Sequence, residues 1–450
     1  MSISSKALEA LRNQLNLTTR DFCDRLEIDI NDYALFIRTE DFSQFPENAA
    51  NTLISIMLEE EQKNLLSYKD KFPLEKEGYF SNSKILRHLD KLLKLENSPE
   101  EVGPITVEFH PTTMCNNACP FCTFKISEIG NDKKSIFDSD LLDNLITDLK
   151  KLTVKGIDIS GGGEPLCHPK IGEIISSFAK ASCDVGLVTN GYALDDESSS
   201  ETKKELRRVI LSNCTWCRIS VDAGSQEIYS LMHGNKSHIR FDDIVKKIEL
   251  LAKDKVAMGS ETTLGVSFLL TPYNFSDLIK SICIFREIKG IDYFQVKPIV
   301  ISPSERSKDY MIFWDKRLFE LLTTIKSYET DVFKIFTLPY KFSDMLLSKS
   351  EGLPFEKCYG HPFYPTIAAD GSILVCCHIL NNLLDNKKIG VYGKISKDES
   401  FYSIWTKPSR FKEGDNIPIG LCPVNCKLSE TNKILQNLYG QKIVHVNFIN

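Results

Sequence analysis

The chain has 450 residues and a net charge of −6, with 42% hydrophobic and 26% charged residues. This balance is ordinary for a globular protein of two or three domains, and it offers no broad basic surface for nucleic acid or membrane lipid. The first residues lack the apolar stretch of a signal peptide, and no apolar run approaches the ~18 residues of a membrane span. We therefore expect a cytoplasmic protein with no membrane partner, whose 14 cysteines stay reduced.

Residues 1–65 are predicted to form a helical module. Apolar residues recur at helical spacing in segments 6–16, 18–28, 30–40 and 47–62, and LTTRDF offers a threonine N-cap followed by an acidic first turn. The order of the segments resembles a helix-turn-helix domain, but residues 1–62 hold five Lys or Arg against twelve Asp or Glu. Phosphate contacts need the opposite sign, so we expect a docking or structural module and no nucleic-acid partner.

Residues 66–103 are predicted to be a polar linker with one short helix and a Pro/Gly end. From residue 105 apolar, β-branched strands alternate with amphipathic helices. We expect the strands at 105–110, 156–160, 184–189, 216–222, 263–270 and 293–300. This alternation predicts an α/β fold, a partial (β/α)6 barrel of parallel strands, with its chemistry at the carboxyl ends of the strands. A hairpin at 364–377 and a final helix at 429–440 are expected near the C-terminus.

Three cysteines follow the first strand with C-x3-C-x2-C spacing: Cys115, Cys119 and Cys122. Three thiolates suit a [4Fe–4S] cluster, because each iron takes one external ligand and the fourth iron stays open. A zinc site completed by His110 or a remote residue, and coincidence, are the alternatives that spacing leaves open.

The loop CNNACPFC resembles the cluster motif of radical S-adenosylmethionine (SAM) enzymes, including the aromatic Phe121 before the third cysteine. The resemblance implies that the three cysteines hold a [4Fe–4S] cluster and that SAM chelates its open iron. It further implies one-electron cleavage of SAM to a 5′-deoxyadenosyl radical, which abstracts a substrate hydrogen atom. In SGGGEP the family's Gly-Gly-Glu matches Gly162, Gly163 and Glu164, expected at the SAM ammonium group. The residues expected to bind the cofactor from the ends of later strands are Asn190, Ser220, Asp222 and Lys297.

A second cysteine group lies near the C-terminus. Cys358, Gly371 and Cys376 meet the pattern C-x12-G-x4-C, and Cys422 and Cys426 follow. This arrangement resembles the SPASM extension, and its shorter twitch form more closely, which implies a second, auxiliary [4Fe–4S] cluster on Cys358, Cys376, Cys422 and Cys426. Cys377 is an alternative to Cys376, because neighbouring strand residues face opposite sides. A structural zinc on the same four thiols is the other interpretation.

The remaining cysteines are scattered. Cys167 follows the glycine turn and is a candidate hydrogen-atom donor to a substrate radical. We interpret Cys23, Cys183 and Cys283 as small buried apolar residues.

The predicted domains are 1–65, a helical module; 66–103, a linker; 104–310, a radical SAM core; and 311–450, a twitch- or SPASM-like domain. We expect a radical SAM oxidoreductase or lyase that tailors a small polar metabolite such as a sugar or aminoglycoside-like compound. An alternative is a maturase that docks a precursor peptide through its N-terminal helices. An iron–sulfur-sensing transcription regulator is the alternative of another class. The enzyme would need an electron donor such as flavodoxin or ferredoxin.

Overall fold

The computed structural model describes residues 5–39, Ala49, Thr52, Ile56, and 79–440 apart from 126–129, 131–132, 195–200, 235–238, 301–315, 339, 343–352, 354, 382–388 and 424. The chain divides into two compact units, Met1–Leu74 and Glu75–Asn450.

The first unit is helical, as predicted. Its helices are α1 (Ser5–Gln14), α2 (Thr19–Leu26) and α3 (Ile30–Thr39). Thr18 caps α2, its hydroxyl oxygen accepting a bond from the Asp21 amide at 3.2 Å. Ala49 and Ile56, from the fourth predicted segment, pack into the same apolar core. The rest of that segment lies outside the described residues.

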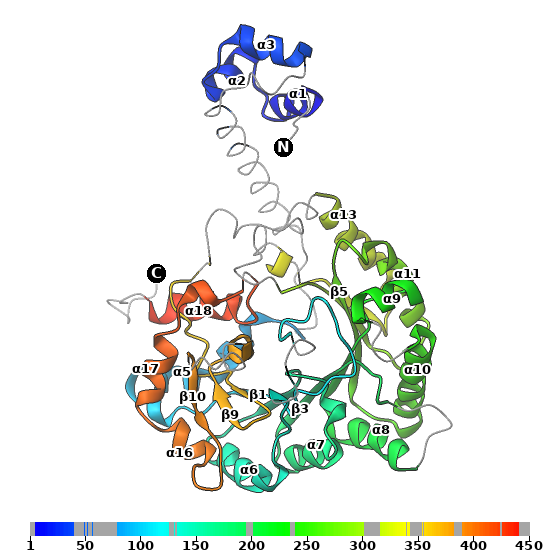
Figure 1. The fold of residues 1–450 in the computed structure, drawn as a ribbon, viewed down its shortest axis with the longest axis vertical. Helices are drawn as coiled ribbons and strands as arrows, with labels where there is room; N and C mark the ends of the chain where they lie inside the picture. Colours follow the sequence, from blue (N-terminus) through cyan, green and yellow to red (C-terminus); the bar gives the residue numbers. More distant parts are fainter. Residues whose placement is uncertain are drawn as a thin grey trace. The chain divides into compact units, whose positions relative to one another are not determined.

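The second unit is built on one sheet with the strand order β10-β9-β8-β1-β2-β3-β4-β5-β6-β7. The first six strands confirm the predicted parallel core: β1 (Thr106–Phe109), β2 (Gly156–Ile159), β3 (Asp184–Thr189), β4 (Trp216–Ser220), β5 (Thr263–Leu270) and β6 (Tyr293–Pro298). Figure 1 shows this sheet curving, with helices on the outside of the curve. In the described part of the chain the sheet stays open, with β10 and β7 at its edges.

Helices on the outer face cover the apolar side of the strands. Phe109 illustrates the packing, because its ring lies 4.8 Å from Phe137 and 5.3 Å from Phe178 of α7. The connecting helices are α6 (Leu142–Lys151), α7 (Ile171–Lys180), α8 (Glu201–Asn213), α9 (Gln226–His233), α10 (Phe241–Met258), α11 (Leu278–Arg286) and α13 (Lys316–Thr324). Alternate residues point the other way, to what we call the inner face: Glu108, His110, Asp158, Ser160, Arg218, Ser220 and Lys297.

Segments after residue 310 extend the core sheet at both edges. β7 (Lys334–Phe336), which was not predicted, pairs in parallel with β6. At the other edge the predicted hairpin is present as β8 (Thr366–Ile367) and β9 (Ser372–Leu374), with β8 parallel to β1. Gly371 turns the hairpin with φ +88°, a backbone conformation that favours glycine. β10 (Val391–Lys394) pairs with β9.

The C-terminal helices pack against the linker that precedes β1 and form hydrogen bonds with it. These helices are α16 (Phe401–Trp405), α17 (Ser409–Asp415) and α18 (Ser429–Tyr439), and the linker carries α5 (Leu89–Asn97). The fully buried Trp405 indole donates to the Val102 carbonyl at 2.8 Å, and the Arg410 guanidinium stacks 3.9 Å from the Trp405 ring. Tyr439 of α18 donates to the Leu92 carbonyl at 2.8 Å.

Two of the three cysteines predicted to be small buried apolar residues are buried. Cys23 and Cys183 are buried, but Cys283 is exposed on α11, so its assignment as a buried residue was wrong. Among the described residues, no helix is long and apolar enough to cross a membrane.

Candidate functional site

The loop after β1 holds Cys115, Cys119 and Cys122, all of them partly buried. The Asn117 amide donates to the Cys115 sulfur at 3.4 Å, and the Cys122 amide donates to the Cys119 carbonyl at 3.1 Å. Burial raises the pKa of Cys115 to about 12, and the charges of Glu164 and Cys122 act in the same direction. Burial also raises the pKa of Cys119, as do the charges of Asp222 and the other two thiols. The three thiols thus lie within electrostatic reach of one another.

The raised pKa values keep Cys115 and Cys119 protonated in the absence of a cation, and a coordinated metal ionises such thiols. Among the described residues, no three His, Cys, Asp or Glu side chains converge tightly enough for one metal ion. A cubane cluster binds each thiolate on a different iron, so its ligands need not meet at one point. Three partly buried thiols on one loop are therefore a donor set that fits a cluster.

The glycine turn after β2 packs directly against the cysteine loop. The Glu164 amide donates to the Met114 carbonyl at 2.8 Å. A Cβ atom on Gly163 would lie 2.3 Å from the Met114 carbonyl oxygen and 2.8 Å from that of Thr112. Both neighbours are backbone atoms that cannot swing aside. Glycine at position 163 is therefore required for the two loops to touch.

Glu164 ties this turn to the end of β3. Its carboxylate accepts bonds from the Thr189 hydroxyl at 2.5 Å, the Asn190 amide at 2.7 Å and the Leu166 amide at 3.1 Å. Burial nevertheless raises the pKa of Glu164 to about 7. The oxygen that accepts from Asn190 takes only that one of these bonds, and a carboxylate oxygen can accept two. The side chain thus caps a turn and still has room for a cationic ligand.

Asn190 also reaches back to the cysteine loop. Its side-chain amide donates to the Asn116 side-chain oxygen at 2.9 Å, and the Cys167 thiol donates to the same oxygen at 3.8 Å. Burial raises the pKa of Cys167 to about 11, and the charge of Glu164 adds to the shift. Cys167 therefore carries its hydrogen at neutral pH, as a hydrogen-atom donor must.

The end of β4 brings Ser220 and Asp222 beside β5. The Ser267 hydroxyl donates to the Ser220 hydroxyl at 3.3 Å, and the Leu269 amide donates to the Asp222 carboxylate at 2.6 Å. Asp222 has φ +58°, so its backbone turns sharply as the strand ends. Burial raises the pKa of Asp222, and the nearby His233 and Lys297 oppose that shift.

His233, at the end of α9, is a site residue that the sequence analysis missed. One ring nitrogen lies 3.5 Å from the Cys119 sulfur, and the other lies 2.7 Å from the Val221 carbonyl oxygen. The next residue, Gly234, has φ +62°, and a Cβ there would come 2.5 Å from the Ala118 carbonyl oxygen. A histidine in a helix's last turn followed by glycine marks a helix end, but nothing local shows what that end contacts.

Phe121 and the inner-face Lys297 complete the predicted cofactor set. The Phe121 ring lies 5.7 Å from Tyr273, beyond the end of β5. Lys297 projects inward from β6, where burial lowers its pKa and the charge of Asp222 opposes that shift.

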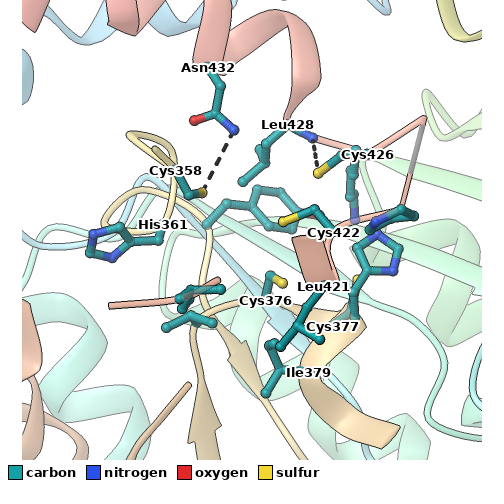
Figure 2. A pocket seen from close by; sticks show the side chains of 16 residues that line it. Cys358, His361, Cys376, Cys377, Ile379, Leu421, Cys422, Cys426, Leu428 and Asn432 are labelled. Carbon is teal, nitrogen blue, oxygen red and sulfur yellow. Dashed lines mark hydrogen bonds between the residues drawn. The ribbon is translucent and has the colours of Figure 1, made fainter. Parts of the chain in front are cut away.

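The second cysteine group lines a single pocket between the hairpin and α18. Figure 2 shows the sulfur atoms of Cys358, Cys376, Cys422 and Cys426 around a common space. The Asn432 side-chain amide donates to the Cys358 sulfur at 3.7 Å, and the Leu428 amide donates to the Cys426 sulfur at 3.4 Å. Much of the remaining lining is apolar, including Ile379, Ile417 and Leu421. The donor set fits a cluster with four thiolate ligands.

Cys376 and Cys377 have different surroundings, although both line the pocket. Burial raises the pKa of Cys376, and the charges of the cysteines around the pocket raise it further. Cys377 is instead hydrogen-bonded to Glu108 on β1, and its pKa is raised by burial and by that carboxylate. Cys376 is thus the one of the pair placed among the other three thiols.

The two cysteine groups are connected through the sheet edge. The Asn381 side-chain amide donates to the Thr123 carbonyl at 2.7 Å, just after Cys122. Phe124 packs against the apolar cluster of Ala368, Leu374 and Leu380. The hairpin region therefore supports the end of the first cysteine loop.

The part of the chain that carries the first cysteine loop matches a known protein family. Residues 109–281 match the family model of the radical SAM superfamily, so this part of the chain is a radical SAM domain. The superfamily implies SAM and a [4Fe–4S] cluster.

Curated relatives share part of this domain. A tungsten-containing aldehyde ferredoxin oxidoreductase cofactor-modifying protein of Pyrococcus furiosus is 28% identical over 37% of this chain and 44% of its own length. A GTP 3′,8-cyclase of Microcystis aeruginosa is 28% identical over 28% of this chain and 37% of its own length. The chain thus matches less than half of the length of either relative.

Solved structures of similar fold include Streptococcus suis SuiB. SuiB bound to S-adenosylmethionine superposes with a TM-score of 0.51 at 14% identity, covering 88% of each chain. SuiB bound to its precursor peptide SuiA gives a TM-score of 0.52 at 13% identity, covering 84% of each chain. At this identity the likeness concerns the fold alone.

Proposed function

We propose that this enzyme cleaves SAM reductively on a cluster held by Cys115, Cys119 and Cys122, and abstracts a hydrogen atom from a small polar metabolite. The observation that carries the proposal is the backbone contact between the cysteine loop and the Gly162–Glu164 turn. That contact puts three thiols and a buried carboxylate side by side at the ends of β1 and β2.

In this proposal Glu164 receives the SAM ammonium group. An incoming cation would favour the charged carboxylate, whose pKa burial holds near 7. The absence of side chains at Gly162 and Gly163 lets the ligand approach the backbone. Asn190, Ser220 and Asp222 would contact the rest of SAM from the neighbouring strand ends, with Phe121 beside them. When bound, the cluster supplies the electron that cleaves SAM to methionine and a 5′-deoxyadenosyl radical.

We further propose an auxiliary [4Fe–4S] cluster on Cys358, Cys376, Cys422 and Cys426, in a twitch-type C-terminal domain. The common pocket of the four thiols supports this ligand set, and the contact of Cys377 with Glu108 favours Cys376 over Cys377. Cys167 remains the candidate hydrogen-atom donor, since its thiol lies one side chain away from Asn190.

A small metabolite is our first choice of substrate, and oxidation or elimination our first choice of reaction. Both curated relatives are named for small molecules, a cofactor and GTP. A peptide maturase is the second candidate, favoured by the precursor peptide bound to SuiB. In that case the helices of residues 5–39 would dock the leader of the precursor. A short precursor gene beside this one, whose product stimulates SAM cleavage, would distinguish the second candidate.

The test is iron content and 5′-deoxyadenosine release from anaerobically reconstituted full-length protein under reductant. We expect about eight irons per chain, four for each cluster, and deoxyadenosine from the wild type. Cys119→Ala should lose about four irons and all SAM cleavage, whereas Cys283→Ala, at an exposed cysteine, should lose neither. A content of about four irons per chain, with deoxyadenosine released, would refute the auxiliary cluster alone. Zinc in place of iron, with no deoxyadenosine, would refute the proposal.

A further inference from the structure

Two cations, Arg218 and Lys297, project from the inner face of the sheet. Ile219 and Phe294 are fully buried on the outer face, where the Phe294 ring lies 6.4 Å from Phe285 of α11. Arg218 is next to Ile219 on β4, and Lys297 lies three residues after Phe294 on β6, so both side chains point to the opposite, inner face, where they are partly exposed. Neither side chain forms an ion pair with any acid that the structure describes.

Two aromatic side chains contact Arg218. Its guanidinium lies 5.4 Å from the centre of the Trp216 ring, and it is hydrogen-bonded to the Tyr293 side chain. The rings lie across glycines of adjacent strands: a Cβ would come 2.1 Å from Trp216 if placed on Gly186, and 2.0 Å from Tyr293 if placed on Gly265. The buried Nε of Arg218 has no hydrogen-bond partner among the described residues. The guanidinium is thus oriented by its surroundings and still has a donor to give.

The acids of the inner face are already engaged elsewhere. Glu108 and Asp158 bind the Lys427 ammonium at 2.9 Å and 3.0 Å. Asp222 accepts from the Leu269 amide. Burial lowers the pKa of Lys297, and the charges of Arg218, Lys341 and Lys427 lower it further, so several cations share this space.

A partly buried cation is stabilised by pairing, so two of them that form no ion pair with a described carboxylate point to an anionic ligand. A guanidinium presents paired N–H donors that match the oxygens of a carboxylate or a phosphate. The arrangement selects for such an oxyanion over a neutral alcohol or amide.

We propose that Arg218 and Lys297 bind an oxyanion group, carboxylate or phosphate, of the substrate, over a floor formed by Trp216 and Tyr293. The proposal rests on the proposed function, because the inner face is the substrate side only if SAM occupies the strand ends. It changes the predicted role of Lys297 from cofactor binding to substrate binding.

The test uses reconstituted, SAM-loaded full-length protein, titrated by calorimetry with malonate and, separately, with inorganic phosphate at constant ionic strength. The wild type should bind one equivalent of at least one probe, and the stronger probe identifies the oxyanion. Arg218→Gln and Lys297→Gln should each weaken that binding at least tenfold, and Arg218→Lys, which keeps the charge but not the fork, should weaken it less than Arg218→Gln. Arg208→Gln, at an exposed arginine of α8, is the matched control and should bind as the wild type does.

Two results would overturn the proposal while leaving the proposed function intact. One is that neither probe binds, or that both bind Arg218→Gln as tightly as the wild type. The other is that Arg218→Gln weakens SAM itself as much as the probes, which would assign the cation to the carboxylate of SAM. Failure of the wild type to release deoxyadenosine would refute the proposed function. That release is measured independently of the titrations, so the two failures can be distinguished.

Discussion

Lys427 joins the C-terminal segment to the first two strands, and replacing it with methionine should destabilise the second unit markedly. The ammonium sits between Glu108 and Asp158, whose side chains are 4% and 12% exposed. Tyr364 donates a further hydrogen bond to the Asp158 carboxylate. Lys427→Met keeps the length of the stem but leaves two buried carboxylates without a counterion.

The magnitude follows from this burial. Removing one partner of a buried ion pair costs about 3–5 kcal/mol, because the remaining charge is left uncompensated. Lys427 is itself 37% exposed, so solvent screening reduces the effect, and we expect a loss of about 3 kcal/mol. For a unit of this size that corresponds to a fall in melting temperature of about 4 °C.

The loss of stability in Lys427→Met should depend on pH. Burial raises the pKa of Glu108, but the charge of Lys427 and the hydrogen bond from His110 outweigh burial and hold the pKa well below its usual range. A carboxyl whose folded pKa is depressed contributes stability above its unfolded pKa, and that stability is lost as pH falls through the folded value. In Lys427→Met burial still raises the pKa, the hydrogen bond from His110 still lowers it, and the largest lowering effect, the charge of Lys427, is lost, so the pKa of Glu108 rises. The deficit should therefore be small near pH 4.5 and should grow toward pH 8.

The measurement is anaerobic thermal unfolding from pH 5 to pH 8, with Lys407→Met as the control. Lys407 is 51% exposed and pairs with Glu399 on the surface, so its loss should cost under about 1 kcal/mol at every pH. Adding Glu108→Gln and Asp158→Asn to Lys427→Met should recover part of the loss. The reasoning fails if Lys427→Met melts with the control, or if its deficit shrinks as pH rises.

Three further predictions concern single sites. Gly163→Ala should distort the cysteine loop, lower the free energy of unfolding by about 1–3 kcal/mol and reduce SAM cleavage. The control is Gly172→Ala in α7, where the nearest atoms are 3.9 Å away, and it should leave the melting temperature unchanged or raise it. Equal behaviour of the two variants would contradict the contact between the two loops. Cys376→Ala should remove about four irons per chain and Cys377→Ala should remove none, and the reverse pattern in an iron assay would exchange their roles. Trp405→Phe should lower the melting temperature through loss of a buried hydrogen bond worth about 1–2 kcal/mol, an effect that wild-type melting would exclude.

Local patterns in the sequence determined much of this protein. The alternation of apolar strands and amphipathic helices predicted six parallel strands, and the turn at Asp370 and Gly371 predicted the hairpin. Cysteine spacing predicted both cysteine groups, and the SGGGEP motif predicted the glycine turn. These features depend on periodicity, turn chemistry and ligand spacing, and each of these signals is contained in a short stretch of consecutive residues.

Only the tertiary structure decided which residues meet across long separations. It placed His233 beside Cys119, gave Cys376 and Cys377 different neighbours, and set Arg218 on an inner face where it forms no ion pair with any carboxylate that the structure describes. It also joined β7 and β8 to the core sheet, which no local pattern indicated, since strand pairing is chosen by burial and hydrogen bonding over the whole chain. The sequence therefore specified the donors and the elements that carry them. The folded sheet decided which partners they have, because contacts between distant segments depend on the packing of the complete chain.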